Sequence, residues 1–151
     1  MRLQDATADQ LIQDVELVAP LLMTLDEPTV REKPAERWSV AEVVGHLVDS
    51  ALNNHQRFIR VQQVDALDFP DYEQNHWANA ANYHEADWKE LVELWRLVNL
   101  NLARVMRAIP DDHLPKSCSI GSHETCTLEF LVTDYVDHMN HHLNKIRERI
   151  D

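Results

Sequence analysis

The sequence contains little glycine, with two residues in a chain of 151. Tight turns and β-hairpins depend on glycine, so this scarcity argues against a turn-rich β protein. Abundant leucine, valine, alanine, glutamate and asparagine are typical of a helical chain instead. A chain of this length can bury one hydrophobic core, and we therefore expect residues 1–151 to form a single all-α domain.

Basic residues are also scarce, because 14 lysines and arginines face 26 aspartates and glutamates, for a net charge of −12. Such a charge repels phosphate backbones and anionic lipid headgroups, so the sequence predicts neither a nucleic acid nor a membrane partner. The N-terminal part has no long apolar run, since the stretch VELVAPLLM is interrupted by Glu16 and Pro20. We expect a cytoplasmic protein.

Cysteine occurs only at Cys118 and Cys126. Their C-x7-C spacing matches no common zinc or redox motif, and a reducing cytosol keeps such residues as thiols. We therefore expect two free loop thiols that are not metal ligands.

Two capping boxes predict where helices begin. Thr7 to Gln10 has the form T-x-x-Q and precedes an apolar pattern that predicts a helix over roughly 8 to 26, bent or restarted at Pro20. Ser39 to Glu42 has the form S-x-x-E and precedes a second pattern, which predicts a helix over roughly 40 to 64.

Two further helices follow from apolar residues spaced alternately three and four apart. Asp87 to Glu90 is another start signal, and the pattern after it predicts a helix that ends at Pro110. The last pattern predicts a helix over roughly 128 to 149. Four long amphipathic helices indicate a four-helix bundle, and the connections are long enough for a crossover.

Histidine is unusually frequent at nine residues, and three of them lie in DHMNHHLNKI. His138 and His142 continue the buried stripe of Leu131 and Tyr135, so they should point toward the other helices. Two imidazoles one helical turn apart can bind the same divalent ion. His141 lies on a charged flank instead, which predicts a neighbour of the site and not a ligand.

His46, at the margin of the apolar face of the second long helix, is the candidate third ligand. Three neutral imidazoles leave a divalent ion with an open coordination position, as in catalytic sites. An alternative is that His46 simply hydrogen-bonds in the core, and that His138 and His142 pair with Tyr135 or a backbone carbonyl.

Two segments also carry a resemblance. RWSVAEVVGHLVDS (37–50) and TLEFLVTDYVDHMNHHLNKI (127–146) contain the patterns W-S-x-x-E-x-x-x-H-L and H-x-x-x-H in this order. They resemble the DinB-like (YfiT-type) superfamily of bacterial four-helix proteins. The resemblance implies a bundle with a long crossover, a homodimer, and a zinc, nickel or iron ion bound by His46, His138 and His142.

The same resemblance implies an enzyme that transfers a low-molecular-weight thiol, such as bacillithiol or mycothiol, to an electrophile, or a related isomerase or hydrolase that activates water. The sequence departs from this expectation because it has no recognisable thiol-binding motif. It also lacks the glutamate of H-E-x-x-H, which makes peptidase-type activation of water less attractive. A non-catalytic, stress-associated metal-binding dimer is the alternative, and an open coordination position on the metal would favour the enzyme.

A polar line on the second long helix points in nearly the same direction as His46 and includes Ser50, Asn53 and Arg57. We expect Asn53 and Arg57 to contact substrate, with Arg57 binding a distant carboxylate. The alternative for this line is a solvated helix face. Asp49 could accept a hydrogen bond from His46 or lie at the surface.

The connection between the second and third long helices supplies Tyr72, Asn75 and Trp77. These residues could cover the site or simply pack on the bundle. Trp77 and Tyr135 complete the set of candidate substrate contacts.

Overall fold

The computed structural model describes residues 1–150 and contains four long helices. α1 packs against α5 and α6, and α3 packs against the same two helices, so the predicted four-helix bundle is confirmed. The four helices are α1 (Leu3–Met23), α3 (Val40–Val61), α5 (Trp88–Ala108) and α6 (Leu128–Ile150).

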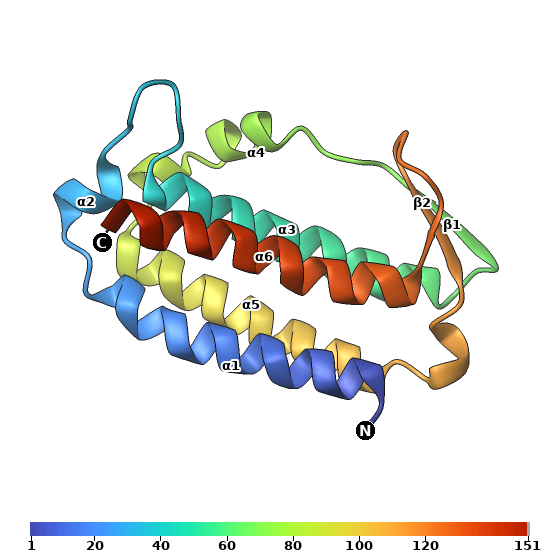
Figure 1. The fold of residues 1–151 in the computed structure, drawn as a ribbon. Coiled ribbons are helices and arrows are strands. Elements are labelled where there is room, and N and C mark those ends of the chain that lie inside the picture. Colours follow the sequence, from blue (N-terminus) through green and yellow to red (C-terminus); the bar gives the residue numbers. More distant parts are fainter. Residues whose placement is uncertain (151) are drawn as a thin grey trace.

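The connection between α3 and α5 runs back along the bundle, so that these two consecutive helices point in the same direction (Figure 1). This is the expected long crossover. It contains β1 (Ala66–Phe69), α4 (Gln74–Ala80) and the 3-10 helix η1 (Tyr83–Glu85). Because α4 and η1 both contact α3, the crossover covers the helix that carries His46.

The predicted helix starts are confirmed for α3 and α5. Ser39 accepts a hydrogen bond from the backbone N–H of Glu42 at 3.2 Å, and Glu42 accepts one from the backbone N–H of Ser39 at 3.1 Å. Asp87 accepts a hydrogen bond from the backbone N–H of Glu90 at 3.0 Å. These bonds satisfy N–H groups that lack partners inside the helix, and they fix where each helix begins.

The predicted start of the first helix is wrong. α1 begins at Leu3, so Thr7 lies inside it and donates its hydroxyl to the carbonyl of Leu3 at 2.9 Å. Gln4 explains the extra turn, because its side chain is fully buried and donates to the carbonyl of Ile109 at 2.9 Å. α1 also does not restart at Pro20, and it ends at Met23. A short α2 (Glu27–Arg31), capped by Asp26, follows it.

A small sheet at one end of the bundle was not predicted. β1 pairs in parallel with β2 (Ser117–Ile120), which pairs antiparallel with β3 (Cys126–Thr127). A 3-10 helix, η2 (Asp111–His113), precedes β2. Cys118 and Cys126 are therefore strand residues that face each other across β2 and β3, not loop residues, and both are free thiols.

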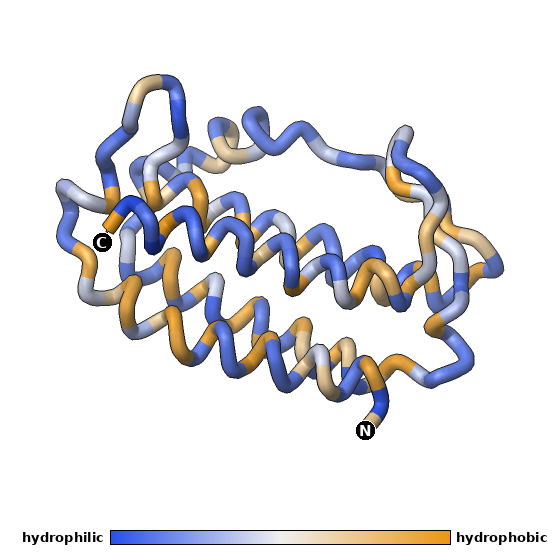
Figure 2. The backbone as a smooth tube through the Cα atoms, viewed as in Figure 1, coloured by the Kyte–Doolittle hydropathy of each residue, from blue (hydrophilic) through white to orange (hydrophobic). Residues whose placement is uncertain are grey.

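The core lies between the four long helices, and each of these helices carries both hydrophobic and hydrophilic residues (Figure 2). Each large apolar side chain buried here contributes about 1.5–3 kcal/mol to folding. The largest fully buried side chains include Trp95, Phe58, Leu11, Leu102 and Met139. None of the helices in residues 1–150 has the length and hydropathy that a membrane span requires.

The crossover packs closely against α3 at Gly45. A Cβ atom at this position would lie 2.1 Å from Cγ of Tyr83, so only glycine leaves room for the tyrosine ring.

We expect Gly45→Ala to reduce the free energy of unfolding by about 1–3 kcal/mol through overpacking. In a Tyr83→Ala background the same change should be neutral or stabilising, because alanine is the better helix former. Chemical denaturation of the four proteins in this cycle measures both effects, and equal effects in the two backgrounds would contradict this packing.

Candidate metal centre

His46 lies in the first half of α3, and the capping box at Ser39 sets the helix register that turns it inward. Its side chain is 2% exposed. The indole ring of Trp38 lies 5.1 Å from its imidazole, and the ring of Tyr72 lies 6.4 Å away, measured between centroids. His46 is therefore held in an aromatic environment that limits its contact with solvent.

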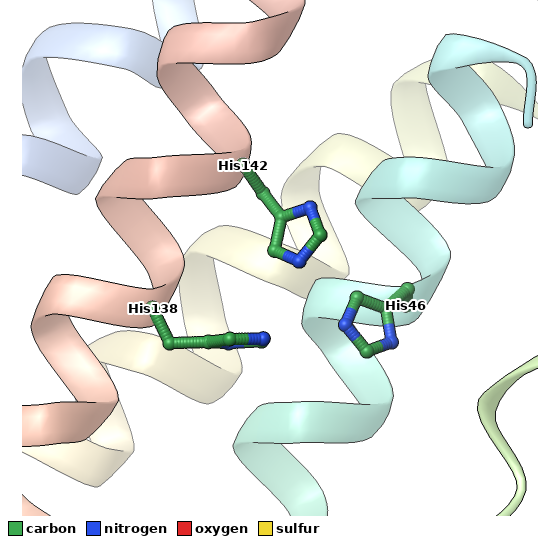
Figure 3. A group of neighbouring side chains, drawn as sticks. All are labelled: His46, His138 and His142. Carbon is green, nitrogen blue, oxygen red and sulfur yellow. The ribbon is translucent and has the colours of Figure 1, made fainter.

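α6 presents His138 and His142 toward His46 (Figure 3). The imidazole centroid of His46 lies 5.5 Å from that of His138 and 4.9 Å from that of His142, and the last two are 4.7 Å apart. One nitrogen from each ring can be chosen so that all three lie within 4.8 Å of one another. The structure thus brings together the three histidines that the sequence predicts as ligands.

The three imidazoles are neutral at neutral pH because burial disfavours their charged forms. Burial, and then the nearby His142 and His138, lower the pKa of His46 to about 4. Burial followed by His138, His141 and Lys145 lowers the pKa of His142 to about 4, and burial also lowers the pKa of His138. A neutral imidazole has a free lone pair, which is the form that binds a metal ion.

Hydrogen bonding within the core, the alternative to a metal, does not account for His46. Among residues 1–150 neither Nδ1 nor Nε2 of His46 has a hydrogen-bond partner. Tyr135 does not supply one, and the partner of its hydroxyl is Asn99. A buried polar atom without a partner costs about 1–3 kcal/mol. The donor set of three neutral imidazoles, one with both nitrogens free, fits a divalent ion.

His141 lies on the exposed face of α6, with its ring 5.7 Å from that of His142. Among the described residues, the ligand atoms of His46, His138 and His142 converge, and His141 is not part of this group. This position agrees with its predicted role as a neighbour, although whether the metal depends on it stays a prediction.

Asp49 is buried, so the expectation of a surface residue is wrong, whereas its predicted role in orienting His46 stays a prediction. Its side chain is 4% exposed, and its Oδ1 accepts a hydrogen bond from the hydroxyl of Tyr83 at 2.6 Å. Burial raises its pKa. Through Oδ1, Asp49 therefore anchors the crossover to α3, while its Oδ2 has no hydrogen-bond partner among residues 1–150.

Two cavities border the histidines. The first, here called the polar cavity, has a volume of about 400 Å³ and is lined by His46 and His138 and, about three turns further along α3, by Arg57. The second, here called the Trp38 cavity, has a volume of about 380 Å³ and is lined by His142, Trp38, Val43 and Ile146. Gln74 of α4 lines both. A small molecule can thus reach the three histidines through either cavity.

The predicted substrate contacts are only partly brought together. Arg57 lines the polar cavity, and so does Tyr135. Within the described residues, Asn53 and Trp77 line neither cavity. Asn53 donates to the carbonyl of Asp49 at 2.9 Å, and Trp77 packs against Tyr72 with tilted rings whose centroids are 5.0 Å apart.

The sequence reading missed Asp71, Asp134, Asn54 and Trp38 as residues of the cavity walls. Asp134 lies one helical turn before His138, and this spacing indicates that the two side chains share a face of α6. Asp71 lies in the crossover and reaches the polar cavity only through the tertiary fold, so no local signal marks it.

The lowered pKa values predict how the metal-free protein responds to pH. Histidines in the unfolded chain have pKa values near 6.5, whereas those of His46 and His142 are about 4 in the folded state. Between these values the unfolded chain binds more protons, so the free energy of unfolding should fall as the pH drops below about 6.5.

Urea denaturation of metal-free protein between about pH 7 and pH 5 tests this dependence. A double variant, His46→Gln with His142→Gln, should show a flatter dependence on pH than the native chain. His76→Gln, a change at an exposed histidine of α4, is the matched control and should leave the slope unchanged. Parallel curves for the native chain and the double variant would contradict the prediction.

Comparison with known proteins places the chain in a family. Residues 10–146 match the DinB superfamily, and the chain belongs to it. YfiT of Bacillus subtilis (strain 168), named "Putative metal-dependent hydrolase", is 26% identical over 112 residues, which are 74% of this chain and 63% of YfiT. The match therefore spans less than two thirds of that relative. BH0277 of Halalkalibacterium halodurans carries the same designation and is 23% identical over 131 residues, 86% of this chain and 76% of BH0277.

The solved structure of Bacillus subtilis YfiT, described as having "an unusual four-helix bundle topology", has a TM-score of 0.80 to this chain. It is 24% identical and the alignment covers 94% of this chain and 85% of YfiT. This likeness confirms the four-helix bundle fold. The expected homodimer stays a prediction.

Proposed function

We propose that this protein is a metal-dependent enzyme whose divalent ion, zinc, nickel or iron, is held by His46, His138 and His142. The observation that carries the proposal is the convergence of these three imidazoles, with ligand atoms within 4.8 Å of one another, beside two cavities. Such an ion, when bound with an open coordination position, lowers the pKa of water or a thiol toward neutrality.

The chain's own residues prepare the site in two ways. Burial keeps the imidazoles neutral, so little proton release accompanies their use as ligands. Trp38 and Tyr72 pack against His46 and limit its rotation. A ligand set that is already oriented costs less free energy to assemble.

Transfer of a low-molecular-weight thiol to an electrophile is the reaction we propose first. Its support is the pair of cavities of about 400 and 380 Å³, since a transfer reaction requires space for two substrates beside one reacting centre. The Trp38 cavity has apolar side chains in its wall and suits an organic electrophile. The polar cavity suits a hydrophilic thiol.

Hydrolysis is the second candidate, and Asp134 favours it. This carboxylate lines the polar cavity together with His138, where it could accept a proton from water. The relatives named for metal-dependent hydrolysis agree with this candidate. Asp134 could take the place of the glutamate of H-E-x-x-H, whose absence from the sequence made activation of water less attractive.

One assay separates the candidates. Protein loaded with zinc or nickel is incubated with 1-chloro-2,4-dinitrobenzene and cysteine, and separately with p-nitrophenyl acetate without thiol. Metal-dependent conjugation supports thiol transfer, and metal-dependent ester cleavage supports hydrolysis. Either activity should vanish in His142→Ala and persist in His141→Ala. Stoichiometric metal with neither activity, across several thiols, electrophiles and esters, would overturn the enzyme and favour a non-catalytic metal-binding protein.

A further inference from the structure

The end of the polar cavity opposite the histidines is formed by Arg57. The side chain of this arginine is 9% exposed, and its Nε and Nη2 atoms have no hydrogen-bond partner among residues 1–150. Burying a charged group without hydrogen bonds is unfavourable, so such donors are strong candidates for a ligand.

Neighbouring side chains hold the guanidinium without using its donors. Its central carbon lies 5.6 Å from the centroid of the Phe69 ring, which provides a cation–π contact. The nearest carboxylate oxygen, Oδ1 of Asp71, lies 3.9 Å from Nη2, too far for a hydrogen bond. Asp71 is instead bonded to the backbone N–H of Tyr72 at 2.9 Å and to Nε2 of His123 at 3.0 Å.

The charges around the cavity restrict what Arg57 can bind. Asp71, Glu73 and Asp134 all line it, and the whole chain carries a net charge of −12. A phosphate ester with two charges would be repelled by these groups. A carboxylate, with one charge and two oxygens, matches the planar donors of a single guanidinium.

We infer that the polar cavity binds a small substrate carrying a carboxylate, which Arg57 holds while the reacting group lies at the three histidines. This inference rests on the proposed function and names its substrate class. Ser50, Asn54 and Tyr72 supply uncharged polar groups between the two ends of the cavity. The middle of the substrate should accordingly be polar, as a peptide-like chain is.

The helix gives the length of this substrate. Arg57 follows His46 by three turns, or about 16 Å along the axis. Helix side chains lean toward the N-terminus, and the longer side chain of Arg57 reaches back further than that of His46, so the gap shortens to roughly 10 Å. Two residues of extended peptide plus a thiol-bearing group span about this distance.

Isothermal titration calorimetry with a graded set of thiols tests the inference. The probes are mercaptoacetyl-glycine and mercaptoacetyl-diglycine, each as the free acid and as the C-terminal amide, added to zinc-loaded protein. The diglycine acid should bind at least tenfold more tightly than its amide, because only the acid forms charge-assisted hydrogen bonds with Arg57.

Matched variants assign the effect to one side chain. In Arg57→Gln the diglycine acid should bind no more tightly than the amide, and zinc affinity should be unchanged. Arg57→Lys should restore part of the preference. Arg60→Gln removes the same charge from the exposed face of the same helix, and it should keep the full preference.

Two outcomes would overturn the inference, namely equal binding of acid and amide at every length, or a preference that survives in Arg57→Gln. Failure of the proposed function looks different, because zinc itself would not bind. Acetyl-diglycine and its amide, which lack a thiol, therefore serve as probes on metal-free protein. The acid should still bind more tightly than the amide, and this difference should disappear in Arg57→Gln.

Discussion

Replacing His138 or His142 with alanine should weaken the binding of zinc or nickel by about 100-fold or more, because each change removes one of three ligands. His46→Ala should have the same effect from the other helix. The matched control is His141→Ala, next to His142 in sequence but on the exposed face of α6, and its cost should be at most about 10- to 100-fold.

Calorimetric titration of the four variants measures these affinities, and circular dichroism of each metal-free variant checks that α6 is intact. The register of α6 determines the expected order. If His141→Ala loses the metal while His142→Ala keeps it, the metal uses a different face of the helix and the proposed ligand set is wrong.

Saturating metal should raise the melting temperature of the native chain. Free metal at about 100 times its dissociation constant stabilises the folded state by about 2.7 kcal/mol. For a chain of this length that corresponds to roughly 5–11 °C. Chelation should reverse the shift without unfolding the protein at room temperature, because the apolar core of Trp95, Phe58 and Leu102 forms without the histidines.

Differential scanning calorimetry with and without a chelator measures this shift, and His138→Ala should show none. Identical melting temperatures with and without metal in the native chain would argue against specific binding. A metal-free protein without a cooperative transition would show instead that the core alone does not stabilise the fold.

The bundle could be predicted because local signals and tertiary packing agree in its long helices. Ser39 and Glu42 cap α3 as their spacing requires. On α5 the predicted stripe is buried at Trp88, Leu91, Trp95 and Leu102. The same reasoning failed at Thr7, where the capping motif is present but unused. There the buried contact between Gln4 and Ile109 extends the helix past its local start signal.

The small sheet could not be predicted from its strands. β2 has four residues and β3 has two, which is too short for an alternating pattern to stand out. The pairing of β2 with β1 joins segments about 50 residues apart, so it depends on the tertiary fold that the crossover creates.

The candidate site, too, could be predicted only where local geometry and tertiary packing agree. His138 and His142 were predicted to converge because the period of α6 gives the direction of each side chain, and Arg57 follows from the direction of His46 in the same way. Asn53 satisfies that criterion too, but its amide is bonded to the backbone of Asp49. Local geometry gives a direction, whereas competing hydrogen bonds decide whether a side chain reaches the cavity.

The most direct measurement is a crystal structure of the zinc-loaded protein with data collected at the zinc absorption edge. We predict one anomalous peak within about 2.0–2.2 Å of a ring nitrogen from each of His46, His138 and His142, with a position facing a cavity not filled by any protein atom. A peak at another set of residues would contradict the proposed centre. A fourth protein ligand on the same ion would contradict its proposed catalytic role.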